Sequence, residues 1–171
     1  MKNVNYRNYT VCIAVAVSVL LFPSHRLEAS ETDAFLSRLQ GTWQGDGKAF
    51  GMSARLSMKW EWVLGGKFLR LNLKNEMQSA TGNTSFEGHA YYRPAGEGKY
   101  EGEWFDSRGV SFAIKGNMEG DALTALWGAP GEEQGRSIYK FLEAGKLEVV
   151  DSVRQKDGTW KEFGRFVVVR Q

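Results

Sequence analysis

Strict alternation of apolar and polar side chains over residues 54–63 is the feature that most constrains the fold of this chain. In the segment ARLSMKWEWV the even-numbered positions are apolar and the odd-numbered positions are polar or charged, until Val63 ends the run. Successive side chains of a β-strand point to opposite faces, so this pattern predicts a strand with one dry and one wet face. Gly65-Gly66 follows, a turn that can adopt positive φ angles, and alternation resumes at residues 69–74. The sequence therefore predicts an antiparallel hairpin here.

The same pattern continues to the C-terminus and is interrupted by short turns rich in Gly, Asp and Asn. Sequential strands joined by short turns form an up-and-down meander, and closure into a barrel removes its two unpaired edges. The predicted fold is all-β, a single antiparallel barrel of about ten strands with room for an internal cavity. The predicted strands cover 42–49, 54–63, 67–78, 84–93, 99–106, 110–118, 122–127, 135–143, 146–154 and 159–169.

One short helix is expected before the barrel, over residues 31–40. Phe35, Leu36 and Leu39 give this segment an apolar face, and Gly41 ends it. The helix therefore has one face to bury against the strands.

The N-terminal segment has the features of a secretory signal peptide. Lys2 and Arg7 precede the apolar run VCIAVAVSVLLF, and Ala29 offers a small residue for cleavage. The run is shorter than the roughly 20 residues of a spanning helix, which disfavours the alternative of an uncleaved membrane anchor. We therefore expect residues 1–29 to be removed and residues 30–171 to form the barrel domain. The protein is predicted to be exported, to the periplasm or the medium, without stable membrane insertion.

Composition excludes several classes of function for the processed chain. The signal segment carries three of the 22 basic and one of the 20 acidic residues, so 19 of each remain. A surface with no net charge gives no reason to expect nucleic acid as a partner. The only cysteine is Cys12, inside the signal segment, so disulfides and thiolate chemistry are excluded after cleavage.

Four segments carry a family resemblance. They are GTWQGDG at 41–47, WEWVLGGKFL at 60–69, YEGEWFDSRG at 100–109 and DGTW at 157–160. The chain resembles the calycin-like barrels, and among them the nitrobindin-like group, and it is similar over residues 36–171 to the bacterial domain-of-unknown-function family 1579. The resemblance implies a ten-stranded antiparallel barrel with an internal pocket, no assigned chemistry, and a Gram-negative periplasmic location.

The histidine content argues against a haem cofactor. Nitrobindin-like proteins hold haem through a histidine on a strand near the C-terminus, whereas the final strand here, residues 160–166, has none. His89 is the only histidine after the signal segment, and it shares parity with Glu87 and Arg93. That parity favours the outer face over a role as metal ligand, haem ligand or general base. No cofactor and no metal site are predicted, since one histidine cannot build an ordinary zinc site.

Two other polar groupings have a plain structural interpretation. Glu101 and Glu103 alternate on one strand face and could form an acid–base pair, but the opposite parity carries the aromatic residues, so we interpret them as a solvated face. The segment 106–109, Asp-Ser-Arg-Gly, is interpreted as a hairpin turn rather than as a site with a nucleophilic serine.

Large apolar residues on the inward parity are the candidates for contact with a ligand, with filling of the interior as the alternative role. These predicted lumen residues are Trp60, Trp62, Leu71, Tyr92, Trp104, Phe112 and Trp127. At one barrel end we expect a structural cation–π contact between Trp43 and either Arg165 or Arg170.

Three functions remain open from the sequence. The first is binding of a small apolar or amphipathic molecule in the barrel lumen. The second is an enzyme with a lumen-facing carboxylate, Tyr or His89, and the third is a solid-core structural or interaction module of the cell envelope.

Overall fold

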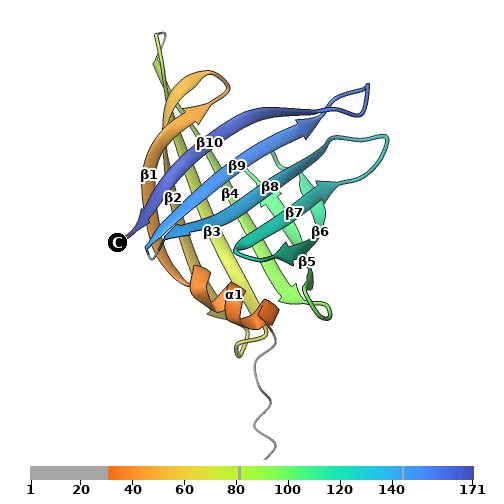
Figure 1. The fold of residues 1–171 in the computed structure, drawn as a ribbon. Helices are drawn as coiled ribbons and strands as arrows, with labels where there is room; N and C mark the ends of the chain where they lie inside the picture. The colour runs from red at the N-terminus through yellow and green to blue at the C-terminus, as the bar shows by residue number, and fades with distance from the viewer. Residues whose placement is uncertain (1–30, 81, 144) are drawn as a thin grey trace, which may run out of the picture.

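In the computed structural model, which describes residues 31–80, 82–143 and 145–171, ten antiparallel strands form one closed barrel (Figure 1). Each strand pairs with its neighbours in sequence, and β1 closes the barrel against β10. The all-β barrel expected from the sequence is thus confirmed, whereas the predicted signal peptide lies outside the described residues. The elements are α1 (Glu31–Leu39), β1 (Gly41–Ala49), β2 (Met52–Val63), β3 (Phe68–Ser79), β4 (Gly82–Pro94), β5 (Lys99–Asp106), β6 (Ser111–Glu119), β7 (Ala122–Gly128), β8 (Gln134–Glu143), β9 (Lys146–Arg154) and β10 (Trp160–Arg170).

The first turn is longer than the two glycines suggest. Strand β2 ends at Val63 and β3 begins at Phe68, so four residues connect them. Leu64, Gly65 and Gly66 all have positive φ angles, and the amides of Gly66 and Lys67 both donate to the carbonyl of Val63. The hairpin is the predicted one with a wider turn.

Glycines allow β1 to approach β10 closely where the barrel closes. A Cβ atom at Gly45 would lie 2.0 Å from the carbonyl oxygen of Val167, and one at Gly47 would lie 2.1 Å from that of Arg165. Cβ atoms do not approach carbonyl oxygens this closely, so the pairing of β1 with β10 requires glycine at both positions.

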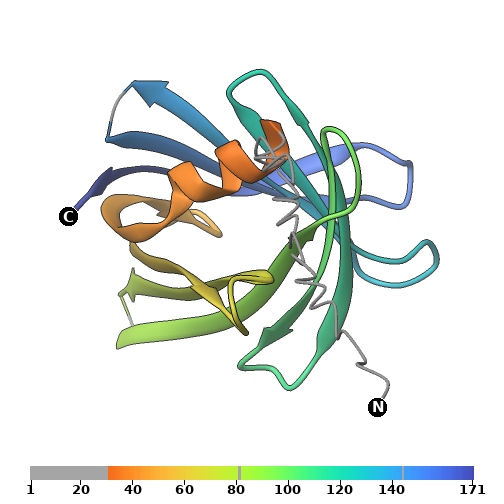
Figure 2. The ribbon, with the colours of Figure 1, turned by 90° about the horizontal axis from the view of Figure 1, so that it is seen from below.

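Helix α1 lies across one end of the barrel (Figure 2) and buries its apolar side chains there. Trp43 stands beneath it, fully buried, and its Nε1 donates to the carbonyl of Leu39 at 2.7 Å. The guanidinium carbon of Arg170 lies 4.3 Å from the centroid of the Trp43 ring, and its nitrogens donate to the carbonyls of Arg38 and Gln40. Arg170 thus fixes the end of the helix to the barrel.

Arg165, the other candidate for this contact, lies on the outer surface. Its guanidinium forms ion pairs with Glu148 at 2.5 Å and with Glu162 at 2.6 Å. Of the two arginines, only Arg170 contacts Trp43.

Aromatic side chains fill the interior next to the helix. The Trp60 ring lies 5.4 Å from the Tyr92 ring and 5.3 Å from the Tyr139 ring, and Tyr92 lies 5.6 Å from Tyr100. All four are buried, and we call this filled part of the barrel the helix half. Among the described residues, no helix is long and apolar enough to cross a membrane.

Candidate ligand-binding cavity

The other half of the barrel is hollow and contains a cavity of about 360 Å³. Turns of an up-and-down barrel alternate between its ends, so the β1–β2, β5–β6 and β7–β8 turns lie at the end opposite α1, and residues from these turns line the cavity. We call this part the cavity half. Its volume is within the range of small-molecule sites. The lining consists of Phe50, Leu56, Leu73, Asn75, Phe86, Trp104, Asp106, Arg108, Trp127, Glu133, Ser137, Tyr139, Asp151, Val153 and Phe163.

Two tryptophans form walls of the cavity because glycines on the neighbouring strands make room for their rings. A Cβ atom at Gly88 of β4 would lie 2.2 Å from the indole of Trp104, and one at Gly135 of β8 would lie 2.0 Å from that of Trp127. Each indole therefore occupies the space that a side chain on the next strand would take. This placement holds both rings against the barrel wall and leaves the centre unfilled.

Further aromatic residues pack against these two tryptophans, and one of them, Phe86, also lines the cavity. Phe86 stacks on Trp104 with an interplanar angle of 15° and a centroid distance of 6.2 Å. Phe112 packs against Trp127 with a centroid distance of 5.5 Å. The walls therefore offer flat aromatic surfaces to a guest molecule.

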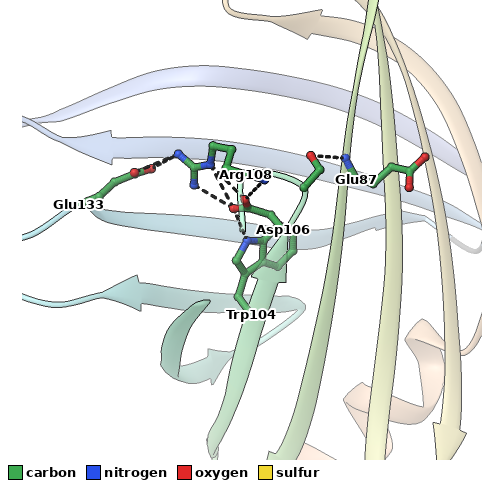
Figure 3. A network of polar contacts seen from close by, with 6 residues as sticks. Glu87, Trp104, Asp106, Arg108 and Glu133 are labelled. Atoms are coloured by element: carbon green, nitrogen blue, oxygen red, sulfur yellow. Dashed lines mark hydrogen bonds and ion pairs between the residues drawn. The ribbon is translucent and has the colours of Figure 1, made fainter. Parts of the chain in front are cut away.

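An arginine joins two turns at the rim of the cavity (Figure 3). Both oxygens of Glu133 accept hydrogen bonds from Nη1 of Arg108 at 3.0 Å, and Oδ2 of Asp106 accepts one from Nη2 at 2.8 Å. Trp104 Nε1 donates to the same Asp106 oxygen at 3.0 Å. The network connects the β5–β6 turn to the residues that precede β8 and fixes the Trp104 indole.

The carboxylate of Asp106 is buried but fully partnered. Its side chain has an exposed fraction of 0%. Burial alone would raise the pKa of Asp106, but hydrogen bonds from Arg108 and Trp104 outweigh it and lower the pKa below the usual value. Asp106 therefore remains ionised and paired at neutral pH.

A stacked aromatic pair forms an apolar lip at the same rim. The rings of Phe50 and Phe163 lie 4.8 Å apart with an interplanar angle of 14°, and the Phe50 amide donates to the Phe163 carbonyl at 2.6 Å. Phe50 has a positive φ of 51° and an exposed fraction of 63%. The β1–β2 turn thus presents a large apolar side chain to solvent at the mouth of the cavity.

Asp151 is the polar residue of the cavity with the most unusual environment. Its Oδ1 accepts a hydrogen bond from Ser137 Oγ at 2.5 Å, and its Oδ2 lies beside Gly164, where an added Cβ would be 3.2 Å away. Burial raises the pKa of Asp151 to about 6, and the hydrogen bond from Ser137 opposes this shift only in part. No cationic side chain of residues 31–80, 82–143 or 145–171 forms an ion pair with it.

The floor of the cavity is the boundary with the helix half. Tyr139 lines it, and its hydroxyl is hydrogen-bonded to that of Tyr92. Burial raises the pKa of both tyrosines well above 10, so both hydroxyls are neutral. Asn75 also lines the cavity, and its buried Oδ1 has no hydrogen-bond partner within the described part of the chain.

The seven predicted lumen residues divide between the two halves. Trp104 and Trp127 line the cavity, and Phe112 lies against Trp127. The others belong to the filled interior: Trp60, Leu71 and Tyr92 are completely buried there, and Trp62 is half-buried against the same core.

Several cavity residues are absent from the sequence-based prediction. The sequence predicts only a turn at Asp106 and Arg108, and this turn is present, because the Arg108 amide donates to Asp106 Oδ1 and Gly109 has a φ of 79°. The same two side chains also reach into the cavity. Asp151 carries a signal that could have been used, since it shares the inward parity of Val149 and Val153.

The residues considered for metal or acid–base chemistry lie on the outside. His89 is exposed, pairing across the sheet with Asn72 and Phe105, and Glu103 is exposed while Glu101 forms an ion pair with Arg93. The described residues contain no group of three or more potential metal-ligating side chains. None of the described residues that line the cavity is a histidine.

Comparison with known proteins supports the fold. The family described as "Protein of unknown function (DUF1579)" matches residues 28–170. A crystal structure of Rv2717c from M. tuberculosis superposes with a TM-score of 0.61 at 16% sequence identity, covering 84% of this chain and 99% of that one. No curated protein matches this sequence. At this level of identity the structural likeness extends to the barrel alone.

Proposed function

Since the chain belongs to the DUF1579 family of proteins of unknown function, whose description gives no activity, we propose a function from the cavity itself: the barrel binds a small apolar or amphipathic molecule. One observation carries this proposal, a cavity of about 360 Å³ with aromatic walls and a few polar groups. Ligand sites are typically concave, mostly apolar and supplied with a small number of placed polar groups.

The construction of the cavity supports binding over a solid-core module. Two tryptophans that would fill the lumen are held against the wall by Gly88 and Gly135. The side chains around a cavity lack packing partners on one side, and this lowers the stability of the fold. A hollow interior bounded by large side chains is therefore costly unless a guest molecule occupies it. The apolar lip of Phe50 and Phe163 gives such a guest a surface to meet first.

An enzyme remains the second candidate, favoured by one specific observation. Asp151 faces the lumen beside Ser137, and its pKa of about 6 suits proton transfer near neutral pH. Within residues 31–80, 82–143 and 145–171 the one histidine is His89, which lies on the outer face and therefore cannot activate a nucleophile beside Asp151. Binding is therefore the function that the geometry supports best.

We also propose that the protein works outside the cytoplasm. The support is the basic start, the apolar run and the small residue at Ala29. Measurement of the intact mass of the protein from its own host tests this, and a mass that includes residues 1–29 in the major form would contradict it.

Ligand binding is tested by calorimetric titration of n-octanol into the wild-type protein and a variant with a filled cavity. Leu73→Trp adds a large ring at a lining position, whereas Leu126→Trp makes the same change at an exposed position of β7. We expect wild type and Leu126→Trp to bind octanol and Leu73→Trp to lose binding. Equal binding by all three proteins would place the octanol site elsewhere.

Native mass spectrometry of protein purified from its own host gives an independent readout. A stoichiometric bound mass would support the proposal and identify the natural ligand. An absorbance spectrum taken on the same sample reports whether that ligand is haem.

A further inference from the structure

The side chains that line the cavity include more acidic groups than basic groups. Three carboxylates line it, those of Asp106, Glu133 and Asp151, against one guanidinium, that of Arg108. Arg108 is engaged with two of them, Asp106 and Glu133, at the rim. Asp151 accepts a hydrogen bond from Ser137, and no cationic side chain of the described part of the chain forms an ion pair with it. The cavity therefore holds an unpaired acid.

Asp151 sits where the hollow and filled halves meet. On the same face of β9, Val149 toward the helix half is fully buried, and Val153 toward the rim lines the cavity. Asp151 itself lines the cavity together with Trp104 and Trp127. A molecule that enters with its apolar part against Trp104 and Trp127 can place a polar head at Asp151.

The unpaired polar atoms of the cavity are acceptors. An ionised carboxylate can only accept hydrogen bonds, and the partnerless amide oxygen of Asn75 is an acceptor as well. Desolvating a carboxylate without a counter-charge is costly, and a bound cation with N–H donors removes that cost. Aromatic faces around such a head add attraction through their quadrupoles.

We propose that the ligand of this cavity is an amphipathic cation, a primary or secondary amine with an apolar body, whose ammonium group pairs with Asp151. This inference rests on the proposed function, since it names the ligand class of the same cavity. An apolar acid would be repelled by Asp151, and a neutral apolar alcohol would gain only the apolar contacts.

The pairing makes binding depend on pH in a defined direction. The groups that face Asp151 are Ser137 and Tyr139 from β8, Tyr92 from β4 and Gly164 from β10, and the tyrosines stay neutral across this range. Alkyl ammonium groups also stay charged, so ionisation of Asp151 controls the interaction. With a pKa of about 6 for Asp151, amine affinity falls about tenfold from pH 8 to pH 5.

The test is calorimetry with three probes that share one chain length: n-octylamine, n-octanol and n-octanoate, at about pH 8 and about pH 5. The proteins are wild type, Asp151→Asn, which keeps the shape and removes the charge, and Glu103→Gln, which removes a carboxylate from the outer face. Thermal unfolding of each variant confirms that it is folded.

At about pH 8 we expect wild type and Glu103→Gln to bind octylamine at least about tenfold more tightly than octanol, and octanoate most weakly. Asp151→Asn should lose about tenfold to a hundredfold in octylamine affinity, keep its octanol affinity and bind octylamine equally at both pH values. Equal binding of octylamine and octanol by wild type at about pH 8, or octylamine binding unchanged in Asp151→Asn at that pH, would overturn the amine assignment while leaving the cavity as a binding site. If none of the three probes binds, both the amine assignment and the proposed function fail.

Discussion

The two halves of this barrel are built from the same strands with the same alternation, yet one is filled and the other is hollow. In the helix half, Trp60 is completely buried between Tyr92 and Tyr139. In the cavity half, Trp104 lies over Gly88 at the wall and remains partly exposed to the cavity. The difference shows that a side chain's inward direction does not determine whether it fills the lumen. Its neighbours on the adjacent strands decide that.

The two halves also treat polar groups differently. In the helix half Arg170 donates to the carbonyls of Arg38 and Gln40 at the end of the helix, and its guanidinium lies over the ring of Trp43. In the cavity half Asp151 is half-buried at the cavity wall, and no side chain of the described residues forms an ion pair with it. We conclude that the helix half is organised for stability and that the cavity half carries an energetic cost consistent with a binding role.

The largest expected effect comes from truncating a tryptophan in the filled half. Trp60→Ala removes a fully buried ring and leaves a void that its aromatic neighbours cannot close, so we expect a loss of about 3–5 kcal/mol in the free energy of unfolding. Trp104→Ala enlarges an existing cavity and should cost about 1–2 kcal/mol. Urea denaturation of both variants measures the difference, and equal losses would contradict the contrast between the halves.

Replacing the unpaired acid should stabilise the protein. The pKa of Asp151 is raised by burial to about 6 from 3.8, so the folded state holds this proton where the unfolded state has released it. Stability therefore falls as pH rises from about 4 to about 6, by up to about 3 kcal/mol in total. Asp151→Asn removes this penalty and should be more stable than wild type by up to that amount at about pH 8, and similar to it at about pH 4.

Denaturant unfolding of wild type and Asp151→Asn across this pH range isolates the contribution of the one carboxyl group. A variant that is less stable than wild type at pH 8 would show that Asp151 stabilises the fold, contrary to our account.

The arginine at the helix end should matter more than the arginine on the barrel surface. Arg170→Met removes the cation over Trp43 and two hydrogen bonds to the end of α1, for an expected loss of about 2 kcal/mol. Arg165→Met removes only exposed ion pairs and should cost at most about 1 kcal/mol. Thermal unfolding compares the two, and a larger loss for Arg165→Met would refute this assignment.

The smallest expected change in stability tests how the cavity is kept open. A methyl group at Gly88 would lie 2.2 Å from the Trp104 indole and push it toward the empty lumen, at a cost of about 1 kcal/mol. We expect Gly88→Ala to weaken octanol binding several-fold because the ring then occupies part of the cavity. Octanol affinity that is unchanged by the substitution would mean that the indole does not define the site.

The barrel could be predicted from the sequence because strand alternation is a local signal. Alternation predicted the hairpin at 54–78. It also predicted that Trp60 and Trp104 both point inward, because each lies on the inward-facing parity of its own strand. Alternation gives no information on the position of each side chain along the barrel axis. That position decides whether an inward-pointing side chain lies in the helix half or in the cavity half. The sequence predicted that an arginine makes a cation–π contact with Trp43. Which of Arg165 and Arg170 makes it depends on the position of the helix end, which the sequence pattern does not give.

The polar part of the site was harder to predict for a different reason. Asp106 and Arg108 form a good turn by themselves, and nothing local indicates that Arg108 reaches Glu133, 25 positions away in the chain. Asp151 interrupts an apolar parity with an acid, which is a local signal. Its lack of a counter-ion became visible only once the neighbouring strands were in place.

The most direct test of our central claim is a titration with n-octylamine followed by the indole N–H signals of the tryptophans in a ¹H–¹⁵N spectrum. The chain has six tryptophans, with Trp43 and Trp60 in the helix half and Trp104 and Trp127 on the cavity walls. Our account predicts saturable shifts of the Trp104 and Trp127 signals while those of Trp43 and Trp60 stay in place. Shifts of equal size in the helix half, or no shift at Trp104 and Trp127, would contradict it.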